Sequence, residues 1–202
     1  MAATAGKRNA SASRQRILEA AGELLAQGDG TFEMAWVARA AGVSQGLAYH
    51  HFGSKDGLLG ALVNDFYDRA EDAVLMARLD DYADWETRER ERVRRYIEFL
   101  LADPLGVTVV TRLAGTPAVA AISTQRWDRL VTEGSRNIAD GQSRGMVKAT
   151  QDATLLAAMV LGAARAAVAR EFAKSKPGSP ARLSRDIWTF IRRGLGLEDN
   201  HD

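Results

Sequence analysis

The amino-acid sequence predicts an all-α protein of about nine helices, with a small N-terminal three-helix domain and a larger C-terminal helical domain. Two observations predict this class. Glycine- and proline-containing breaks, as at residues 27–30 and 176–180, separate the segments of the chain. Within the segments, apolar residues recur at helical spacing, and the first such stripe is Ile17, Leu18, Ala21, Leu24 and Leu25.

Composition limits the class of protein. The chain has 202 residues, of which 46% are hydrophobic, enough for one core and a small second domain. It has no cysteine, which excludes disulfides and thiolate metal sites and suits a reducing cytoplasm. The most apolar stretch, residues 153–169, contains Arg165 and falls short of the ~20 uninterrupted apolar residues of a membrane span. We therefore expect a cytoplasmic protein without a membrane segment.

Charge is distributed unevenly at the N-terminus. The net charge is only +1, yet Lys7, Arg8, Arg14 and Arg16 all precede the first acidic residue, Glu19. No apolar run follows these basic residues, so the segment does not have the pattern of a secretory signal. We expect residues 1–12 to form a disordered basic arm that is either solvated or attracted to phosphate.

Residues 13–60 are expected to form the N-terminal domain, with a helix-turn-helix at its centre. The second helix is predicted from about Glu33 to Ala40, and Gly42 follows where glycine reaches a positive φ without strain. Ser44 then suits the N-cap of a third helix, because its hydroxyl can accept a backbone N–H of the next turn. The second helix of such a motif can lie in the DNA major groove.

Ser44 also has a second interpretation, because residues 42–46 match the G-x-S-x-G pattern of a serine hydrolase. That nucleophile needs a preceding strand and an acid and a histidine downstream. The preceding residues 37–41 are mostly strong helix formers, and the chain's histidines are His50, His51 and His201. We therefore predict no catalytic residue, no enzyme activity and no cofactor.

The exposed face of the predicted third helix carries polar side chains. Gln45 can address a base edge with its donor and acceptor, whereas Tyr49 and His50 suit phosphate oxygens. An ordinary helical hairpin, with Tyr49 and Phe52 in the core, is the alternative interpretation. A metal site at His50 and His51 is not expected, because neighbouring helical side chains point ~100° apart and no third ligand is near in sequence.

The stretch from Arg16 to about Leu62 resembles the DNA-binding domain of the TetR family of transcriptional regulators. The motifs A-A-G-V-S, Y-H-H-F and S-K-D-x-L-L carry this resemblance. It implies a homodimer, most often a repressor, that binds a near-palindromic operator in double-stranded DNA and is released when a small molecule occupies the C-terminal domain. By position, it implies that the DNA contacts are Ser44, Gln45, Gly46, Leu47, Tyr49, His50 and Lys55.

Two positions depart from the family pattern. Many relatives carry Thr or Ser at the start of the second helix and a polar residue at position 36, whereas this chain has Glu33 and Trp36. Glu33 is expected to repel phosphate. Trp36 is open to three interpretations, namely an apolar contact with the DNA backbone, packing on the arm, and partial burial against the first helix, which we favour. Arg39 is either a phosphate donor or a solvated residue.

Residues 61–202 are expected to form an effector-binding and dimerisation domain. The fourth helix is predicted to continue to about Leu79, and the charge-dense residues 80–95 to form the solvated side of a fifth helix. Pro104 and Pro117 predict a short sixth helix between them. The remaining helices are predicted at residues 118–141, 152–174 and 181–193.

The last two helices predict a dimer joined through a four-helix bundle. The eighth helix has a smooth ridge of small residues, and the ninth has an apolar stripe that a monomer would expose. Burial of this stripe within the same subunit is the alternative. The expected interface residues are Ala158, Gly162, Ala166, Leu183, Ile187, Trp188, Phe190 and Ile191.

An effector pocket is expected between the fourth, fifth, seventh and eighth helices. Each candidate residue also fits a plain core position, because aromatic residues and methionines at helical spacing fill interiors by default. Few charges are expected there, which predicts a lipophilic or aromatic effector. The candidates are Phe66, Tyr96, Phe99, Leu100, Trp127, Leu130, Val131, Met159 and Arg165.

Overall fold

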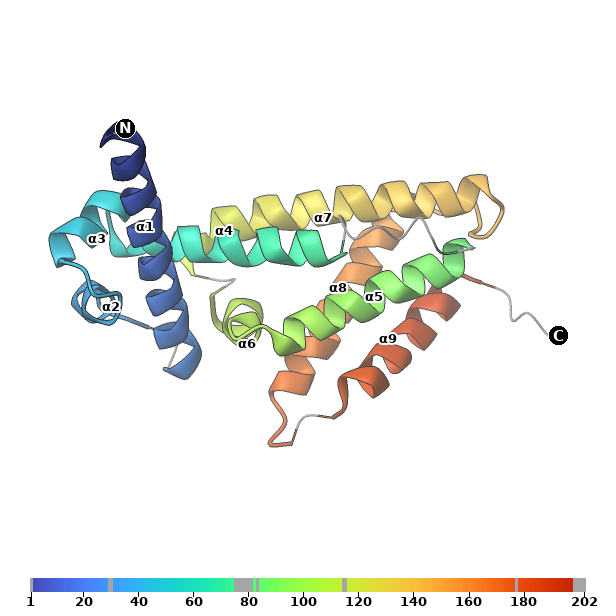
Figure 1. Cartoon of the computed structure of the whole chain (residues 1–202). Coiled ribbons are helices and arrows are strands. Elements are labelled where there is room, and N and C mark those ends of the chain that lie inside the picture. Colours follow the sequence, from blue (N-terminus) through green and yellow to red (C-terminus); the bar gives the residue numbers. More distant parts are fainter. Residues whose placement is uncertain are drawn as a thin grey trace. The chain divides into compact units, whose positions relative to one another are not determined.

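The computed structural model describes residues 2–28, 31–74, 82, 84–113, 116–176 and 178–197. Within these residues the chain forms nine α-helices, one π-helical segment and no strand, which confirms the predicted all-α class (Figure 1). The elements are α1 (Ala2–Gln27), α2 (Met34–Ala40), α3 (Gln45–Phe52), α4 (Lys55–Val74), α5 (Trp85–Ala102), α6 (Gly106–Thr108), η1 (Val109–Leu113), α7 (Pro117–Ser143), α8 (Ala153–Phe172) and α9 (Pro180–Gly194).

The chain divides into two compact units. The first unit comprises residues 1–68 and 104–123, and the second comprises residues 69–103 and 124–202. The helices α4 and α7 contribute residues to both. The boundary at residue 60 stays a prediction, and the contacts place α6, η1 and the first turns of α7 with the N-terminal helices.

The first helix differs from the expected disordered arm, because α1 begins at Ala2 and includes residues 2–12. This segment is rich in alanine, the strongest helix former, and it continues a helix whose later residues are anchored in the core. The Ser13 hydroxyl donates a hydrogen bond to the Asn9 carbonyl oxygen at 2.8 Å. Ile17, Ala21 and Leu25 are buried, as the predicted stripe requires.

The core of the first unit lies where α1, α2, α3 and the beginning of α4 meet. Ile17, Val37, Ala48 and Leu58, one from each helix, are fully buried. The segment after Pro104 covers this core from another side, since a Cβ at Gly22 would lie within 4 Å of side-chain atoms of both Leu62 and Leu105. Helix α3 is therefore held by a continuous apolar core.

The second unit is built from α5, α8, α9, the last residues of α4 and most of α7. Helices α5 and α9 lie side by side and antiparallel (Figure 1). The Nε of Arg192 near the end of α9 donates to Glu86 Oε1 near the start of α5 at 2.8 Å. The buried residues of α5, α8 and α9 include Trp85, Ile97, Val168 and Ile191.

Local signals set the helix boundaries of the second unit. Asp84, Asp152 and Ser179 cap α5, α8 and α9, each accepting a backbone N–H three residues later. The predicted sixth helix between the two prolines corresponds to α6 and η1. The expected continuation of the fourth helix falls on residues 75–79, which lie outside the described residues.

Among the described helices, α8 alone is long and apolar enough to cross a membrane by length and composition, a property shared with core helices of soluble proteins. Only 22% of its most apolar window is buried inside the chain. An apolar helix that its own chain covers only in part has apolar surface left for a partner.

Candidate nucleic-acid interface and ligand pocket

The turn between α2 and α3 has the predicted backbone. Gly42 has a φ of +64°, in the left-handed region where an L side chain is strained. The amide of Val43 donates to the Ala38 carbonyl oxygen at 3.0 Å and closes the end of α2. The glycine thereby sets the direction in which α3 leaves the turn.

Ser44 is the N-cap of α3. Its backbone is extended, with φ −71° and ψ 149°, and its Oγ accepts the backbone N–H of Leu47 at 3.1 Å. The residues before it form helix α2 and not a strand. The hydroxyl is therefore engaged in helix capping, and the strand-turn-helix geometry of a hydrolase nucleophile is not present at Ser44.

The predicted reading face of α3 lies at the surface. Gln45, Gly46 and His50 are exposed, and Tyr49 is 43% exposed. Ala48 on the opposite side is fully buried, while Leu47 is half-buried. Ala48 of α3 therefore packs in the core. The side chains of Gln45, Tyr49 and His50 lie at the surface. The alternative arrangement with Tyr49 in the core is wrong.

Gly46 has no packing role within the chain. A Cβ built at this position meets nothing within 4 Å. Glycine in a helix costs up to about 1 kcal/mol relative to alanine. No described neighbour would clash with a side chain at position 46, so packing within the chain does not explain the glycine. The open backbone at Gly46 suits close approach by another molecule.

The start of α4 carries a cation next to free backbone donors. Ser54 Oγ accepts the Gly57 N–H at 2.9 Å, and Lys55 Nζ lies 3.1 Å from Glu33 Oε1 and 5.7 Å from the centre of the Phe32 ring. The Lys55–Glu33 pair is exposed, and such pairs stabilise a protein by only about 0–1 kcal/mol. Lys55 can therefore exchange Glu33 for a phosphate at small cost.

Helix α2 presents two further exposed side chains, Trp36 and Arg39. Trp36 is 54% exposed, so the favoured interpretation of partial burial describes only the smaller part of its surface. A basic residue of α1, Arg14, packs on α3, with its guanidinium carbon 5.2 Å from the centre of the Phe52 ring.

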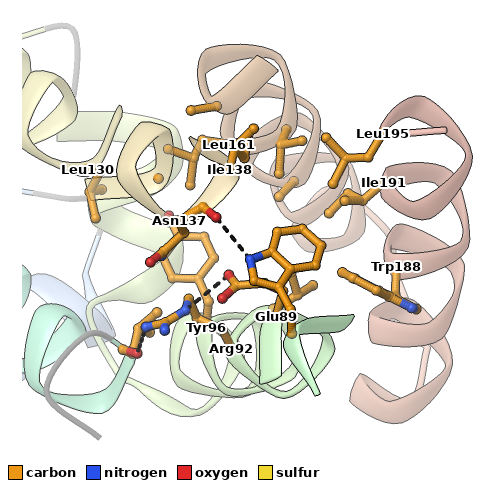
Figure 2. Close-up of a pocket in the computed structure, with 17 residues that line it drawn as sticks. Glu89, Arg92, Tyr96, Leu130, Asn137, Ile138, Leu161, Trp188, Ile191 and Leu195 are labelled. Atoms are coloured by element: carbon orange, nitrogen blue, oxygen red, sulfur yellow. Dashed lines mark hydrogen bonds and ion pairs between the residues drawn. The ribbon is translucent and has the colours of Figure 1, made fainter. Parts of the chain in front are cut away.

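The second unit contains a pocket of about 100 Å³ between α5, α7, α8 and α9 (Figure 2). It differs from the predicted site by including α9 and only the last residue of α4. Its lining is almost entirely apolar and aromatic. The lining residues are Val74, Trp85, Glu89, Arg92, Val93, Tyr96, Leu130, Gly134, Asn137, Ile138, Ala157, Val160, Leu161, Ala164, Trp188, Ile191 and Leu195.

Of the predicted effector residues, Tyr96 and Leu130 line this pocket. Phe66 is buried in the core of the first unit, and Leu100 is buried in the core of the second. Met159 is 56% exposed and faces away from the pocket. These assignments are corrected because helical spacing identifies an inward face but not the partner that covers it.

The other predicted pocket residues make contacts of their own. Phe99 packs under the Arg69 guanidinium, at 5.9 Å, and Trp127 packs under that of Arg165, at 5.7 Å. Val131 is half-buried and does not belong to the pocket lining. The arginines thus cover aromatic rings that the sequence suggested for ligand binding.

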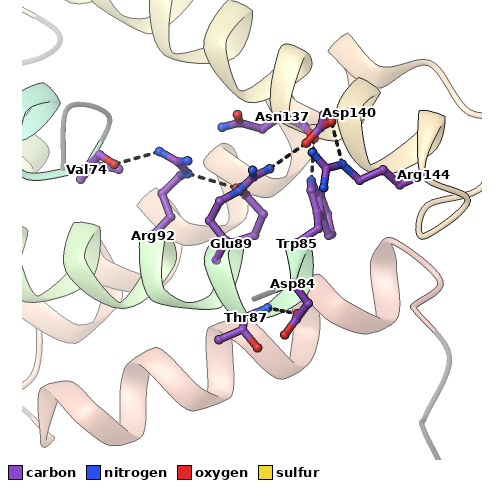
Figure 3. Close-up of polar contacts among 10 residues, drawn as sticks. Val74, Asp84, Trp85, Thr87, Glu89, Arg92, Asn137, Asp140 and Arg144 are labelled. Atoms are coloured by element: carbon purple, nitrogen blue, oxygen red, sulfur yellow. Dashed lines mark hydrogen bonds and ion pairs between the residues drawn. The ribbon is translucent and has the colours of Figure 1, made fainter. Parts of the chain in front are cut away.

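A polar network joins α5 to α7 beside the pocket (Figure 3). Arg88 donates to Glu89 at 3.1 Å and to Asp140 at 2.9 Å, and Arg92 donates to Glu89 at 3.2 Å. Hydrogen bonds from Arg88 and then Arg144 lower the pKa of Asp140 below its ordinary value. The sequence predicted that the charge-dense start of α5 is a solvated face. The structure differs, because Arg88 on this face pairs with Asp140 of α7.

The sequence analysis missed Trp85, Glu89, Arg92 and Asn137. The indole N–H of Trp85 donates to the Asn137 carbonyl oxygen at 2.9 Å, across 52 positions of sequence. The spacing of Glu89 and Arg92 placed them on one side of α5, but no local signal showed which helix lies on that side. Only the partner residues on α7 identify it.

The predicted dimer residues fall on two different surfaces. Ile187, Trp188 and Ile191 are buried within their own unit, so their assignment to a dimer interface is corrected in favour of the alternative, burial in the same subunit. Phe190 is 63% exposed, Ala166 is exposed, and Leu183 is half-buried. The α9 stripe is wide enough that one edge packs against α5 while the other remains outside.

Helix α8 has an outward apolar surface, which we call the α8 face. It extends the predicted ridge by two side chains, Leu155 and Met159, that are exposed within the single chain. A Cβ at Gly162 would meet nothing within 4 Å, so this part of the ridge is open. The α8 face consists of Leu155, Ala158, Met159, Gly162 and Ala166.

Comparison with known proteins connects the first unit to a family. The sequence model of the bacterial regulatory proteins of the tetR family matches residues 17–62. These residues include α2, α3, the turn between them and the start of α4. No curated protein matches the chain by sequence.

Solved structures extend the likeness to most of the chain. A protein from Rhodococcus sp. assigned to the TetR-family transcriptional regulators is 25% identical, with a TM-score of 0.71 over 92% of this chain and 99% of that one. The fatty acid degradation regulator FadR from Bacillus halodurans is 19% identical, with a TM-score of 0.81 over 92% and 97%. AibR in complex with isovaleryl coenzyme A and operator DNA is 21% identical, with a TM-score of 0.70 over 92% and 100%.

Proposed function

The chain belongs to the TetR family of bacterial regulatory proteins and is a DNA-binding transcriptional regulator, not an enzyme; from this premise we propose that it is a homodimeric cytoplasmic repressor. It binds a near-palindromic operator and leaves it when a small lipophilic or aromatic molecule occupies the second unit. The observation that carries the DNA-binding role is the exposed face of α3, with Gln45, Gly46 and Tyr49 outside and Ala48 in the core.

DNA binding follows from the chemistry of this face. Helix α3 enters the major groove, where the Gln45 amide reads a base edge and the open backbone at Gly46 allows close approach. Tyr49 and His50 contact phosphate oxygens, and Lys55 meets a phosphate beside the free backbone N–H groups at the start of α4. Ser44 and Leu47 at the start of α3 complete the proposed contact set.

Dimerisation supplies the second reading helix. Two helices on one dimer must lie ~34 Å apart, or a small multiple, to enter successive major grooves. The α8 face supports this assembly because it is apolar and its Leu155, Met159 and Ala166 are exposed in the single chain. Phe190 of α9 is a second exposed apolar side chain available to the four-helix bundle.

The effector role rests on the pocket and on helix α8. One side of α8 lines the pocket with Ala157, Leu161 and Ala164, while another carries the α8 face. A molecule in the pocket can therefore act on the helix that joins the dimer, and it shifts the population off DNA by its differential affinity for the two states. The structure of AibR in complex with isovaleryl coenzyme A and operator DNA is a case in which a protein of this fold binds both a small molecule and an operator.

The direct test is a mobility-shift titration with DNA that flanks the chain's own gene. We expect binding that weakens steeply with salt, because phosphate contacts release counterions. Tyr49→Ala and Lys55→Ala should weaken binding to all sequences, and Lys55→Ala should reduce the slope of log affinity against log salt by about two, or about one for each subunit of the dimer. Gln45→Ala should instead change the preference between operator sequences.

Unchanged affinity for all three variants would contradict the placement of α3 in the groove. Binding that is absent, or independent of salt, would favour the alternative of a purely structural helical dimer. Circular dichroism of each variant serves as the control for folding.

Gly46→Ala separates DNA binding from stability. Because the added Cβ meets nothing within the chain, α3 should become as stable or up to about 1 kcal/mol more stable. Operator affinity should nevertheless fall at least about tenfold, since the methyl group holds the helix away from the groove. The matched control is Gly42→Ala, which should destabilise the fold by about 1–2 kcal/mol through its positive φ. Thermal unfolding and mobility shift measure the two effects, and full operator affinity for Gly46→Ala would refute this role.

A further inference from the structure

We propose that the pocket of the second unit binds an uncharged, mostly apolar molecule about the size of one six-membered ring, whose single polar group hydrogen-bonds the side-chain amide of Asn137. This inference rests on the proposed function, because the molecule would be the effector. It assigns that effector a size and a hydrogen-bonding residue that the sequence pattern does not supply.

The size follows from the volume. The pocket measures about 100 Å³. Pockets for drug-sized ligands measure about 300–1,000 Å³. A dry cavity of about 150 Å³ lined by aliphatic and aromatic side chains binds benzene. The pocket is smaller than that cavity, which limits the ligand to a single small ring or a short branched chain, and a larger ligand does not fit without rearrangement of the helices.

The walls favour an apolar body. The rings of Trp85, Tyr96 and Trp188 and the aliphatic side chains of Leu161 and Ile191 surround the space (Figure 2). Trp85 is 3% exposed, and its indole N–H already donates to the Asn137 carbonyl oxygen. Most of the pocket surface thus offers dispersion contacts and no hydrogen bond to a ligand.

The charged residues at the pocket are already paired. Arg92 donates to Glu89 and, at 2.9 Å, to the Val74 carbonyl oxygen, while Arg88 donates to the other oxygen of Glu89 (Figure 3). The side chains of Glu89 and Arg92 are only 12% and 17% exposed. A charged ligand would enter without a counter-ion or would break this network, and both are unfavourable in a mostly buried site. The pocket therefore selects an uncharged molecule.

Asn137 supplies the polar contact. Its backbone oxygen accepts the Trp85 indole N–H, but within the described part of the chain its side-chain amide makes no hydrogen bond. An amide offers both a donor and an acceptor, so it can meet a hydroxyl, a carbonyl or another neutral polar group. Asn137 is half-buried, and a neutral polar group of a ligand that reaches this amide gains one hydrogen bond, which gives selectivity among apolar molecules.

The test uses isothermal titration calorimetry on the full chain with three probes of similar size: p-cresol, toluene and 4-methylbenzoate. At neutral pH we expect p-cresol to bind about tenfold more tightly than toluene, through one added hydrogen bond, and 4-methylbenzoate to bind at least tenfold more weakly than p-cresol. In Asn137→Leu, p-cresol should fall to the affinity of toluene while toluene is unchanged or tighter. The Trp85 hydrogen bond is retained in this variant because it uses the backbone.

Toluene binding is the internal control for folding, since it shows that the pocket of Asn137→Leu is intact. A second variant, Ala164→Leu, places a larger side chain in the pocket wall and should abolish binding of p-cresol and toluene alike. The inference is overturned if 4-methylbenzoate binds as tightly as p-cresol, if Asn137→Leu leaves p-cresol binding unchanged, or if neither neutral probe binds.

A mobility shift in the presence of p-cresol separates this inference from the proposed function. Binding of p-cresol without release of DNA would support the pocket assignment and contradict the effector role. Specific DNA binding by a chain that binds neither neutral probe would support the regulator and overturn the pocket assignment.

Discussion

Met159→Arg is expected to convert the proposed dimer into monomers at micromolar concentration and to weaken operator binding at least about 100-fold. Met159 is 56% exposed in the single chain and lies in the middle of the α8 face. A two-fold interface would bring two copies of the new charge close together in apolar surroundings, where an unpaired buried charge costs several kcal/mol. The monomer keeps its reading helix but loses the gain from two heads on one DNA molecule.

Sedimentation and mobility shift measure the two parts of this prediction. Met159→Leu is the conservative control and should remain dimeric. Met146→Arg is the charge control, because Met146 is also an exposed methionine but follows α7 and lies outside the α8 face. A Met159→Arg protein that sediments as a dimer with full operator affinity would show that the α8 face is not the interface.

Trp85→Ala is expected to destabilise the second unit by about 3–5 kcal/mol, the usual cost of removing a large buried aromatic side chain. The ring is buried at the start of α5, lines the pocket and donates a hydrogen bond to α7. Urea unfolding measures the loss. Trp36→Ala, at a 54% exposed site, is the matched control and should cost less than about 1 kcal/mol.

The contact between Trp85 and Gly141 allows a sharper measurement. A Cβ at Gly141 would lie 2.7 Å from the nearest Trp85 ring carbon, so Gly141→Ala should cost about 1–3 kcal/mol through overpacking. In a Trp85→Leu background the same change should cost clearly less, because the ring is gone and only Val147 Cγ2, at 3.1 Å, remains as a tight neighbour of the added Cβ. Equal costs in both backgrounds would contradict this account of the packing.

The helix-turn-helix could be predicted from sequence because its determinants are local. The positive φ of Gly42 and the hydrogen bond from Leu47 N–H to Ser44 Oγ both involve residues within a few positions of one another. The apolar stripe predicted for the first helix also gave its buried side, since Ile17, Ala21 and Leu25 are buried. The exposed face of α3 then followed as the side opposite the core.

The pocket could not be predicted in the same way. Arg88 and Trp85 of α5 find Asp140 and Asn137 on α7, each 52 positions away. Helical spacing showed that Met159 and Trp188 lie on apolar stripes, but not that Met159 faces outward while Trp188 is buried beside the pocket. Two apolar stripes look alike in sequence when one packs within the chain and the other remains exposed.

The sequence by itself determined most of the helices, the cap at Ser44 and the turn before α3, because hydrogen bonds and backbone strain within a few residues decide these features. Only the tertiary structure decided which apolar surface of α8 and α9 is free and where the second unit encloses space. Those outcomes depend on which distant helix lies against each stripe, and packing between helices α5, α7, α8 and α9 selects that partner.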